Sequence, residues 1–230
     1  MCPGCNTRRM VETAAHMVEH VFPAVAVRQW VVVFPRRLRY FLDRDADCLK
    51  RVVGIAMREV QRATAGASTS TAAAGRSGGE IFVHRFGATL NAHVHLHLCM
   101  LDGVVAQGWQ GLAFRRAEVD EACVERVQAA LRQRVLRLFA RRGLLSSETV
   151  GVMQGWGHRG GFSVHAGERV ASQDSAGRER LLRYCARPMF AAFLLGFSLG
   201  AFLLRNLADT TTKPLRHLAL IELSIGLYGL

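Results

Sequence analysis

The stretch "NAHVHLHLCM", residues 91–100, places a histidine at every second position. Side chains two residues apart lie on the same face of a β-strand, so a strand here directs His93, His95 and His97 to one side. The residues between them are apolar and form the opposite face: Val94, Leu96, Leu98 and Met100. This alternation predicts a strand over about 92–101 that has one imidazole face and one face for the hydrophobic core.

The imidazole face predicts a metal site. Neutral imidazoles are common ligands of divalent ions, and a row of three offers several of them on one surface. We therefore treat His93, His95 and His97 as candidate metal ligands. A histidine cluster that is satisfied within the core is the alternative, and the pattern alone leaves both interpretations open.

Two further stretches predict strands beside the histidine strand. "EIFVHRF", residues 80–86, precedes it by a short turn, which predicts an antiparallel hairpin with His84 near the row. The β-branched stretch "VAVRQWVVVF", residues 25–34, predicts a buried strand. We therefore expect an α+β fold, in which an antiparallel sheet has the His-x-His hairpin at its centre and helices packed on one face.

Apolar residues at helical spacing predict helices before and after these strands. The predicted helices cover roughly residues 10–22, 45–62, 123–143 and 175–188. The last of them is basic, ends at Pro188 and carries Tyr184, which we expect to face the imidazole row. The stretch from 63 to 79 is rich in Ala, Ser, Thr and Gly, which predicts a mobile loop.

The charge of the chain predicts a nucleic-acid partner. There are 30 Lys and Arg residues against 18 Asp and Glu residues, a formal net charge of +12, and nearly all of the positive charge is arginine. Arginine binds phosphate in a bidentate geometry, although a basic surface without a specific partner is the alternative. The stretch "PRRLRYFL", residues 35–42, predicts a basic turn whose aromatic rings suit nucleic-acid bases. We expect DNA contacts from Arg36, Arg37 and Arg39, and from Arg183 and Arg187, which flank Tyr184 and are candidates to hold a phosphate. For Arg183 and Arg187, ordinary solvated charge is the alternative.

The cysteines indicate thiols in a reducing compartment. Cys2 and Cys5 have the spacing of one half of a zinc site, but no second pair follows at a suitable distance. Zn²⁺ is therefore expected at these two residues only if further ligands are supplied. The first 20 residues lack the apolar core of a signal peptide, which predicts a cytoplasmic protein.

The composition changes after Pro188. "MFAAFLLGFSLGAFLL", residues 189–204, has no charged residue but is shorter than the ~20 residues that span a bilayer. A second apolar stretch follows near the end of the chain. The pattern predicts two short apolar helices in residues 189–230, and it leaves open whether they contact a membrane or pack as a soluble pair.

Tyr184, the histidines and the positive charge together suggest chemistry on phosphate esters. A tyrosine that attacks phosphorus forms a phosphotyrosine ester, which conserves the energy of the broken DNA bond for later rejoining. A divalent metal can polarise a phosphoryl oxygen and stabilise the charge that develops there. Two alternatives are a zinc-dependent hydrolase, in which Tyr184 is incidental, and an inactive protein that still binds DNA.

Several blocks of the sequence resemble the IS91 and ISCR transposases, which are rolling-circle transposases of the HUH superfamily. The resemblance covers roughly residues 1–188. It rests on "CPGCNTRRMVETAAHMVEHVFP", "VRQWVVVFPRRLRYFL", "FVHRFGATLNAHVHLHLCMLDGV", "RRGLL", "GGFSV" and "ERLLRYCARP". It implies an HUH-endonuclease-like fold and the cleavage and rejoining of single-stranded DNA at transposon ends, through a 5′-phosphotyrosine.

The resemblance also implies roles for individual residues. His93 and His95 match the pair that binds Mg²⁺ or Mn²⁺ in this family, and His97 is a candidate third ligand. Tyr184 matches the catalytic tyrosine. Some relatives carry a second tyrosine four residues earlier, but Arg180 stands there, which implies a single-tyrosine type.

Compared with this family, we expect a chain that is truncated at both ends and has reduced or lost activity. Residues 1–22 correspond to the remnant of a zinc-binding region with the first helix, and residues 23–188 to the catalytic domain. Residues 189–230 form an apolar tail that is unlike the transposases. A bacterial, nucleoid-associated location is the expectation for the DNA-binding part.

Overall fold

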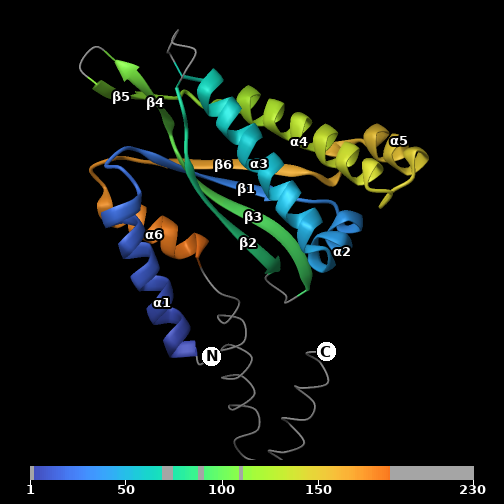
Figure 1. Cartoon of the computed structure of the whole chain (residues 1–230), viewed down its shortest axis with the longest axis horizontal. Coiled ribbons are helices and arrows are strands. Elements are labelled where there is room, and N and C mark those ends of the chain that lie inside the picture. Colours follow the sequence, from blue (N-terminus) through green and yellow to red (C-terminus); the bar gives the residue numbers. More distant parts are fainter. Residues whose placement is uncertain (1–2, 69–74, 88–90, 109–110, 187–230) are drawn as a thin grey trace, which may run out of the picture. The chain divides into compact units, whose positions relative to one another are not determined.

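The computed structural model describes residues 3–68, 75–87, 91–108 and 111–186. The chain divides into two units, residues 1–188 and 189–230, and the described residues belong to the first. This unit is built on a four-stranded antiparallel sheet in the order β2-β3-β1-β6 (Figure 1). The strands are β1 Val27–Val33, β2 Gly79–Phe86, β3 Ala92–Leu101 and β6 Ser163–Val170. The histidine strand β3 is thus an interior strand, which confirms the predicted antiparallel sheet and hairpin.

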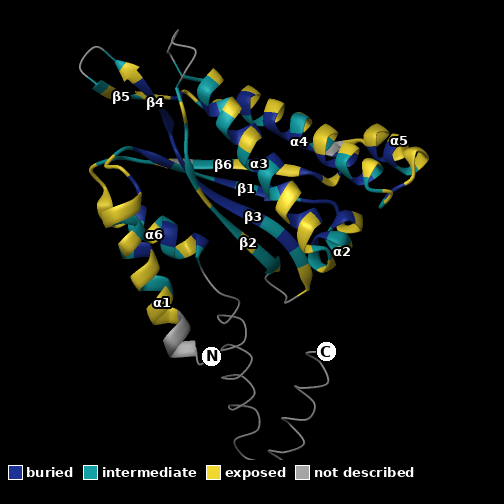
Figure 2. Ribbon diagram, viewed as in Figure 1, coloured by how far each residue is buried: buried dark blue, intermediate teal, exposed yellow. Residues whose placement is uncertain are grey.

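One face of the sheet forms the main hydrophobic core with α2 (Arg36–Arg44), α3 (Ala46–Gly66) and α4 (Glu121–Arg141). The alternate apolar residues of β3 have no exposed surface: Val94, Leu96, Leu98 and Met100. They cluster with Trp30 and Val32 of β1 and with apolar side chains of all three helices. Figure 2 shows these strands buried beneath helices whose outer surfaces are exposed.

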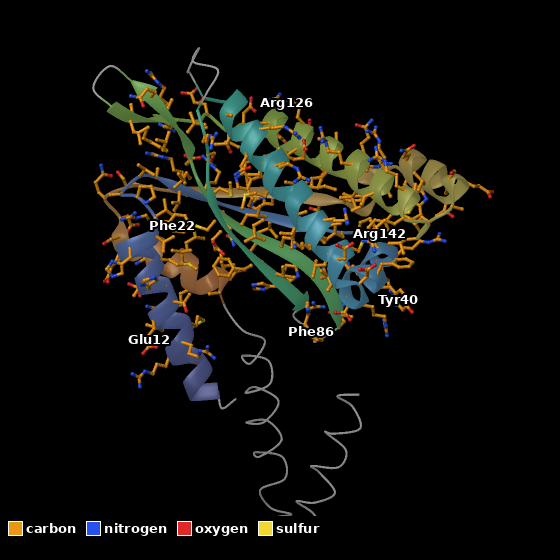
Figure 3. The ribbon with its side chains drawn as sticks, in the orientation of Figure 1. Glu12, Phe22, Tyr40, Phe86, Arg126 and Arg142 are labelled. Carbon is orange, nitrogen blue, oxygen red and sulfur yellow. The ribbon has the colours of Figure 1, made fainter. Side chains whose placement is uncertain are left out.

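Helices also cover part of the opposite, imidazole face. These are α1 (Pro3–His16), the π-helix Met17–Val21 and α6 (Ser175–Cys185). A second, smaller core joins Phe22, beside α1 in Figure 3, to Cys99 and Leu101 of β3 and to Leu182 of α6. The expectation of helices on one face alone was wrong, because the apolar end of the imidazole face must also be covered from water.

Polar side chains define where the helices begin. At four N-termini a side-chain oxygen accepts a hydrogen bond from a backbone N–H three residues on, which satisfies one of the otherwise unpaired donors of the first turn. The capping residues are Asp45 for α3, Asp120 for α4, Ser146 for α5 (Ser147–Gly155) and Asp174 for α6. Arg142, just after α4, pairs with Asp45 at 3.0 Å and so joins the ends of α3 and α4 (Figure 3).

Two stretches differ from the sequence-based expectation. Residues 36–44 form the helix α2 instead of a basic turn, because Leu38 and Leu42 are one helical turn apart and both are buried. The helix α3 continues to Gly66, so the first residues of the expected mobile loop 63–79 are helical. Ser68 and Arg76 each form a β-bridge, to Ala117 and Val105 respectively.

Other elements were not predicted from the sequence. They are α5, the 3₁₀-helix His158–Gly161 and a hairpin of β4 (Gly103–Gly108) and β5 (Gly111–Arg116). The apolar helices expected in residues 189–230 lie outside the described residues. Among the helices of the described part, none is long and apolar enough to cross a membrane.

The core face of β3 leads to a prediction about stability. Leu96→Ala removes a side chain that has no exposed surface, and we expect the free energy of unfolding to fall by about 2–5 kcal/mol. Urea denaturation followed by circular dichroism measures this change. Leu112→Ala is the matched control, since Leu112 on β5 is 78% exposed and should change stability by less than about 0.5 kcal/mol. Equal effects of the two substitutions would contradict the packing described.

Candidate functional site

Three histidines from two neighbouring strands form a compact cluster on the sheet. His84 of β2 lies directly opposite His95 of β3 in the antiparallel register, and His97 follows two residues along the same face. One ligand nitrogen from each of His84, His95 and His97 lies within 4.8 Å of the other two. The ring centroids of His84 and His97 are 4.4 Å apart, and those of His95 and His97 are 5.0 Å apart. We call these three residues the histidine trio.

His93 stands at the end of the row and outside the trio. Its ring centroid is 5.1 Å from that of His95. Its Nε2 atom is buried and has no hydrogen-bond partner among the described residues. The structure therefore brings together two of the three predicted ligands and adds His84, which the sequence had placed near the row without making it a ligand.

Hydrogen bonds orient the rings of the trio. His84 Nε2 lies 2.7 Å from the carbonyl oxygen of Cys185, and His95 Nδ1 lies 2.7 Å from that of His93. A carbonyl oxygen only accepts, so these nitrogens carry the proton, and the other ring nitrogen of each neutral imidazole keeps a free lone pair. The backbone thereby fixes the tautomer of both rings, with the lone pair on Nδ1 of His84 and on Nε2 of His95.

The third ring is held by a side-chain amide. Gln29 Nε2 of β1 lies 2.8 Å from His97 Nδ1 and 3.4 Å from Cys185 Sγ. In this orientation the amide N–H donates to Nδ1, which places the ring proton of neutral His97 on Nε2. The reversed amide would present its oxygen to Nδ1–H and leave His97 Nε2 free for an ion. Gln29 was missed from the sequence, although a polar residue inside a buried strand was a signal for a specific partner.

Burial keeps the imidazoles neutral. It lowers the pKa of His97 to about 4, and the neighbouring His84 and His95 rings add to this shift. Burial also lowers the pKa of His95 and of His93, with a smaller contribution from the positive charge of Arg39. Desolvation disfavours the charged imidazolium, so these rings hold their lone pairs at neutral pH.

The trio fits a divalent transition metal. Three neutral imidazoles form a nitrogen donor set that suits Zn²⁺ and similar transition-metal ions, whereas Mg²⁺ and Mn²⁺ favour oxygen ligands. Three protein ligands also leave coordination positions open for a substrate oxygen. The chemistry of this donor set thus agrees with the expected metal site and does not select a single ion.

Tyr184 lies against the trio from the last turn of α6. Its ring centroid is 5.6 Å from that of His97, with the two rings inclined at 71°, and its side chain is about half exposed. The next residue, Cys185, is buried and touches the trio through its carbonyl group. The same turn therefore anchors the helix and presents a tyrosine to solvent beside the histidines.

The other candidate residues fall in different places. Arg183 forms an ion pair with Glu179 on its own helix, and Arg187 lies outside the described residues. Cys2 also lies outside them, and Cys5 belongs to α1 without a described side chain. The expected zinc remnant therefore stays a prediction.

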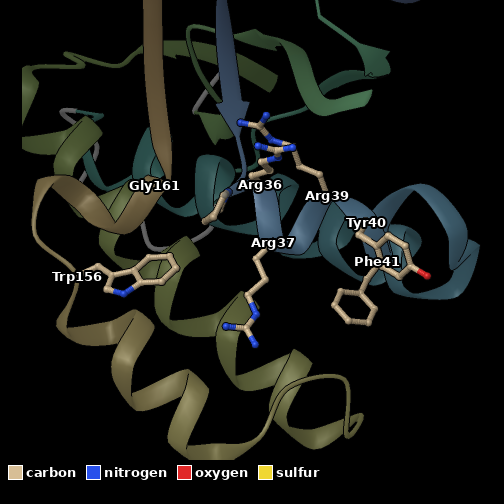
Figure 4. Close-up of a pocket in the computed structure, with 8 residues that line it drawn as sticks. Arg36, Arg37, Arg39, Tyr40, Phe41, Trp156 and Gly161 are labelled. Carbon is tan, nitrogen blue, oxygen red and sulfur yellow. The ribbon is translucent and has the colours of Figure 1, made fainter. Parts of the chain in front are cut away.

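The arginines of α2 line a separate cleft at the end of the sheet. Arg36, Arg37 and Arg39 share this cleft of about 780 Å³ with Tyr40 and Trp156 (Figure 4). Arg39 Nε also donates a hydrogen bond to the carbonyl oxygen of Phe34, at 2.7 Å. Trp156 was not recognised from the sequence, because it lies far along the chain from the arginines that it joins.

The fold and the site define an α+β protein in which a metal-competent histidine trio faces an exposed tyrosine. Residues 78–195, just over half of the chain, match a protein family described as "Putative transposase". The chain belongs to this transposase family, and the matched region contains the trio and Tyr184. No curated protein and no solved structure matches the chain.

The geometry predicts which histidines bind a metal. His84→Ala should weaken binding of Mn²⁺ or Zn²⁺ by at least about 10-fold, because it removes one of the three converging nitrogens. His93→Ala should weaken it much less, since His93 stands outside the trio. Isothermal titration calorimetry of the metal-free protein measures both, with His20→Ala, an exposed residue of the π-helix, as the control. A larger loss for His93→Ala than for His84→Ala would contradict the trio.

Proposed function

We propose that this transposase cleaves and rejoins single-stranded DNA through a covalent 5′-phosphotyrosine at Tyr184, in a rolling-circle reaction of the IS91 type. The observation that carries the proposal is the contact between the Tyr184 ring and the His97 ring, with centroids 5.6 Å apart. Membership of the transposase family and the net charge of +12 support DNA as the substrate.

The reaction begins when the Tyr184 hydroxyl oxygen attacks the phosphorus of a phosphodiester. A bond forms between this oxygen and phosphorus, the bond from phosphorus to the 3′ oxygen breaks, and the phenolic proton is lost as the departing 3′ oxygen gains one. The product strand ends in a free 3′-hydroxyl, and the other strand is esterified to Tyr184. Attack by a 3′-hydroxyl on this ester reverses the chemistry and joins the strands without ATP.

The histidine trio has an orienting role in this proposal. A divalent ion held by His84, His95 and His97 would polarise a non-bridging phosphate oxygen and offset the charge that builds on it. The Cys185 and His93 carbonyl groups leave the lone pairs for such an ion on Nδ1 of His84 and Nε2 of His95. Compared with the expected His93 and His95 pair, the proposed ligands on β3 are shifted by two residues toward Tyr184.

Half exposure of Tyr184 is compatible with a polymer substrate. A nucleophile that attacks a DNA strand must be reachable from a surface, and the side chain of Tyr184 is 48% exposed. The buried Cys185 and Leu182 fix the helix behind it, so the phenol has a defined position without being enclosed. Transposon ends as the target and a nucleoid-associated location follow from the same proposal.

A trapping assay tests the proposal. The full chain is mixed with Mn²⁺ and labelled single-stranded DNA that carries IS91-type end sequences, and products are separated under denaturing conditions with SDS. We expect a protein–DNA adduct that Tyr184→Phe abolishes, because phenylalanine lacks the attacking oxygen. Tyr228→Phe is the matched control, and it should leave the adduct unchanged.

The outcomes separate the three candidate functions. An adduct that is lost with Tyr184→Phe and with His95→Ala supports the tyrosine mechanism. Cleavage that persists in Tyr184→Phe would overturn it and indicate a hydrolase that depends on the trio. DNA binding without cleavage in any tested metal would also overturn it and indicate a protein that only binds DNA.

A further inference from the structure

The cleft beside α2 is lined by both arginines and aromatic residues. The N-terminal part of α2 forms one wall, and the segment that follows α5 forms the other. Figure 4 shows Arg37 extending between the ring of Trp156 on one side and the ring of Phe41 on the other. The side chains that the argument uses are Arg36, Arg37, Arg39, Tyr40, Phe41 and Trp156.

Specific contacts hold the Trp156 wall in place. Arg132 of α4 donates hydrogen bonds to the carbonyl oxygens of Met153, at 2.7 Å, and Trp156, at 3.2 Å. Gly161, at a φ of +72°, lets the chain turn close to Pro35, whose Cβ would lie 3.3 Å from an added side-chain atom. These contacts involve the backbone of the wall and not the Trp156 side chain. Removing the Trp156 ring should therefore leave them intact.

The aromatic rings of the cleft are unusually accessible. Trp156 is 40% exposed and Tyr40 is 58% exposed, although both are large and apolar. The guanidinium of Arg44 lies 4.4 Å from the centre of the Tyr40 ring, which favours a fixed ring orientation. Exposed aromatic faces with an arginine between them are the arrangement on which nucleic-acid bases stack.

The described residues that line the cleft carry positive charge and no negative charge. Three arginines line it, and no Asp or Glu is among its lining residues in the described part of the chain. Burial lowers the pKa of Arg39, and repulsion from the neighbouring charge of Arg36 adds to this shift. A bound phosphate would relieve this repulsion, since arginine pairs with phosphate in a bidentate geometry.

The cleft adjoins the end of the histidine row. Helix α2 packs against β3, and the positive charge of Arg39 acts on His93 and His95. His97, beside Tyr184, and His93 are four residues apart on β3, which corresponds to about 13 Å along a strand. Helix α2, whose arginines line the cleft, therefore lies against the same strand that carries the row.

We propose that this cleft binds an unpaired nucleotide of a single DNA strand, with its base against Trp156 and its phosphate on Arg37. The proposal rests on the proposed function, because it makes the cleft a binding site for the strand that flanks the phosphodiester at Tyr184. Stacking requires an unpaired base, so the cleft selects single-stranded over double-stranded DNA.

Binding measurements in EDTA test the cleft independently of cleavage. The probe is a fluorescein-labelled oligothymidylate of about 15 nucleotides, and a duplex of the same length is the comparison. By fluorescence polarisation, Trp156→Ala should weaken binding of the single strand by about 5- to 100-fold and leave duplex binding unchanged. Trp156→Phe should restore most of the affinity, because phenylalanine keeps an aromatic face.

Charge and surface controls complete the experiment. Arg37→Gln should reduce the slope of log affinity against log salt by about 0.7, the value for one lost contact with a single strand. Arg116→Gln removes an exposed arginine of β5, and Leu112→Ala removes an exposed apolar side chain of the same strand. The first should leave the salt slope unchanged, and the second should leave the single-strand affinity unchanged.

Two results would overturn the proposal that the cleft binds an unpaired nucleotide. In the first, Trp156→Ala binds the single strand with the same affinity as Leu112→Ala. In the second, Trp156→Ala loses affinity for the single strand and for the duplex equally. Neither depends on Tyr184, so failure of the two proposals can be told apart. A missing adduct with Trp156-dependent binding rejects the tyrosine mechanism alone, whereas an adduct without Trp156-dependent binding rejects the cleft alone.

Discussion

Burial of Leu96 and Leu98 in the main core sets the register of β3, and the candidate site depends on that register. Successive side chains of a strand alternate between faces, so a shift of one residue would place the histidines in the core and expose the leucines. Because β3 is an interior strand, it is also paired along both edges, with β1 on one side and β2 on the other. The core thus holds an imidazole face in place, although polar rings contribute little to folding themselves.

Helix α6 packs on the imidazole face and places Tyr184 and Cys185, which are distant in sequence, beside the histidines. The Cys185 carbonyl oxygen accepts a hydrogen bond from His84, and the Cys185 sulfur lies beside Gln29. These contacts tie the last turn of α6 to β1 and β2 on either side of β3. Tyr184, one residue earlier, is therefore held beside the trio by the turn that these contacts anchor.

Much of the fold was predictable because its signals are local. The period of two over residues 92–101 predicted β3 with its correct bounds, and apolar spacing predicted α3, α4 and α6 closely. The helix α2 was predicted as a turn, because its several arginines are typical of an exposed segment and only two leucines mark its buried face. The hairpin of β4 and β5 was also missed, because its strands are short and Gly-rich and rely on mutual pairing.

The sequence by itself determined the two-faced strand, the α+β class and the side chains available for chemistry, because alternation and charge are properties of neighbouring residues. Tertiary structure decided which of those side chains meet. His84 joins His95 through a cross-strand register, Gln29 reaches His97 from another strand, and Trp156 faces the arginines of α2 across a cleft. Such contacts depend on long-range pairing and packing, which residue spacing along the chain does not specify.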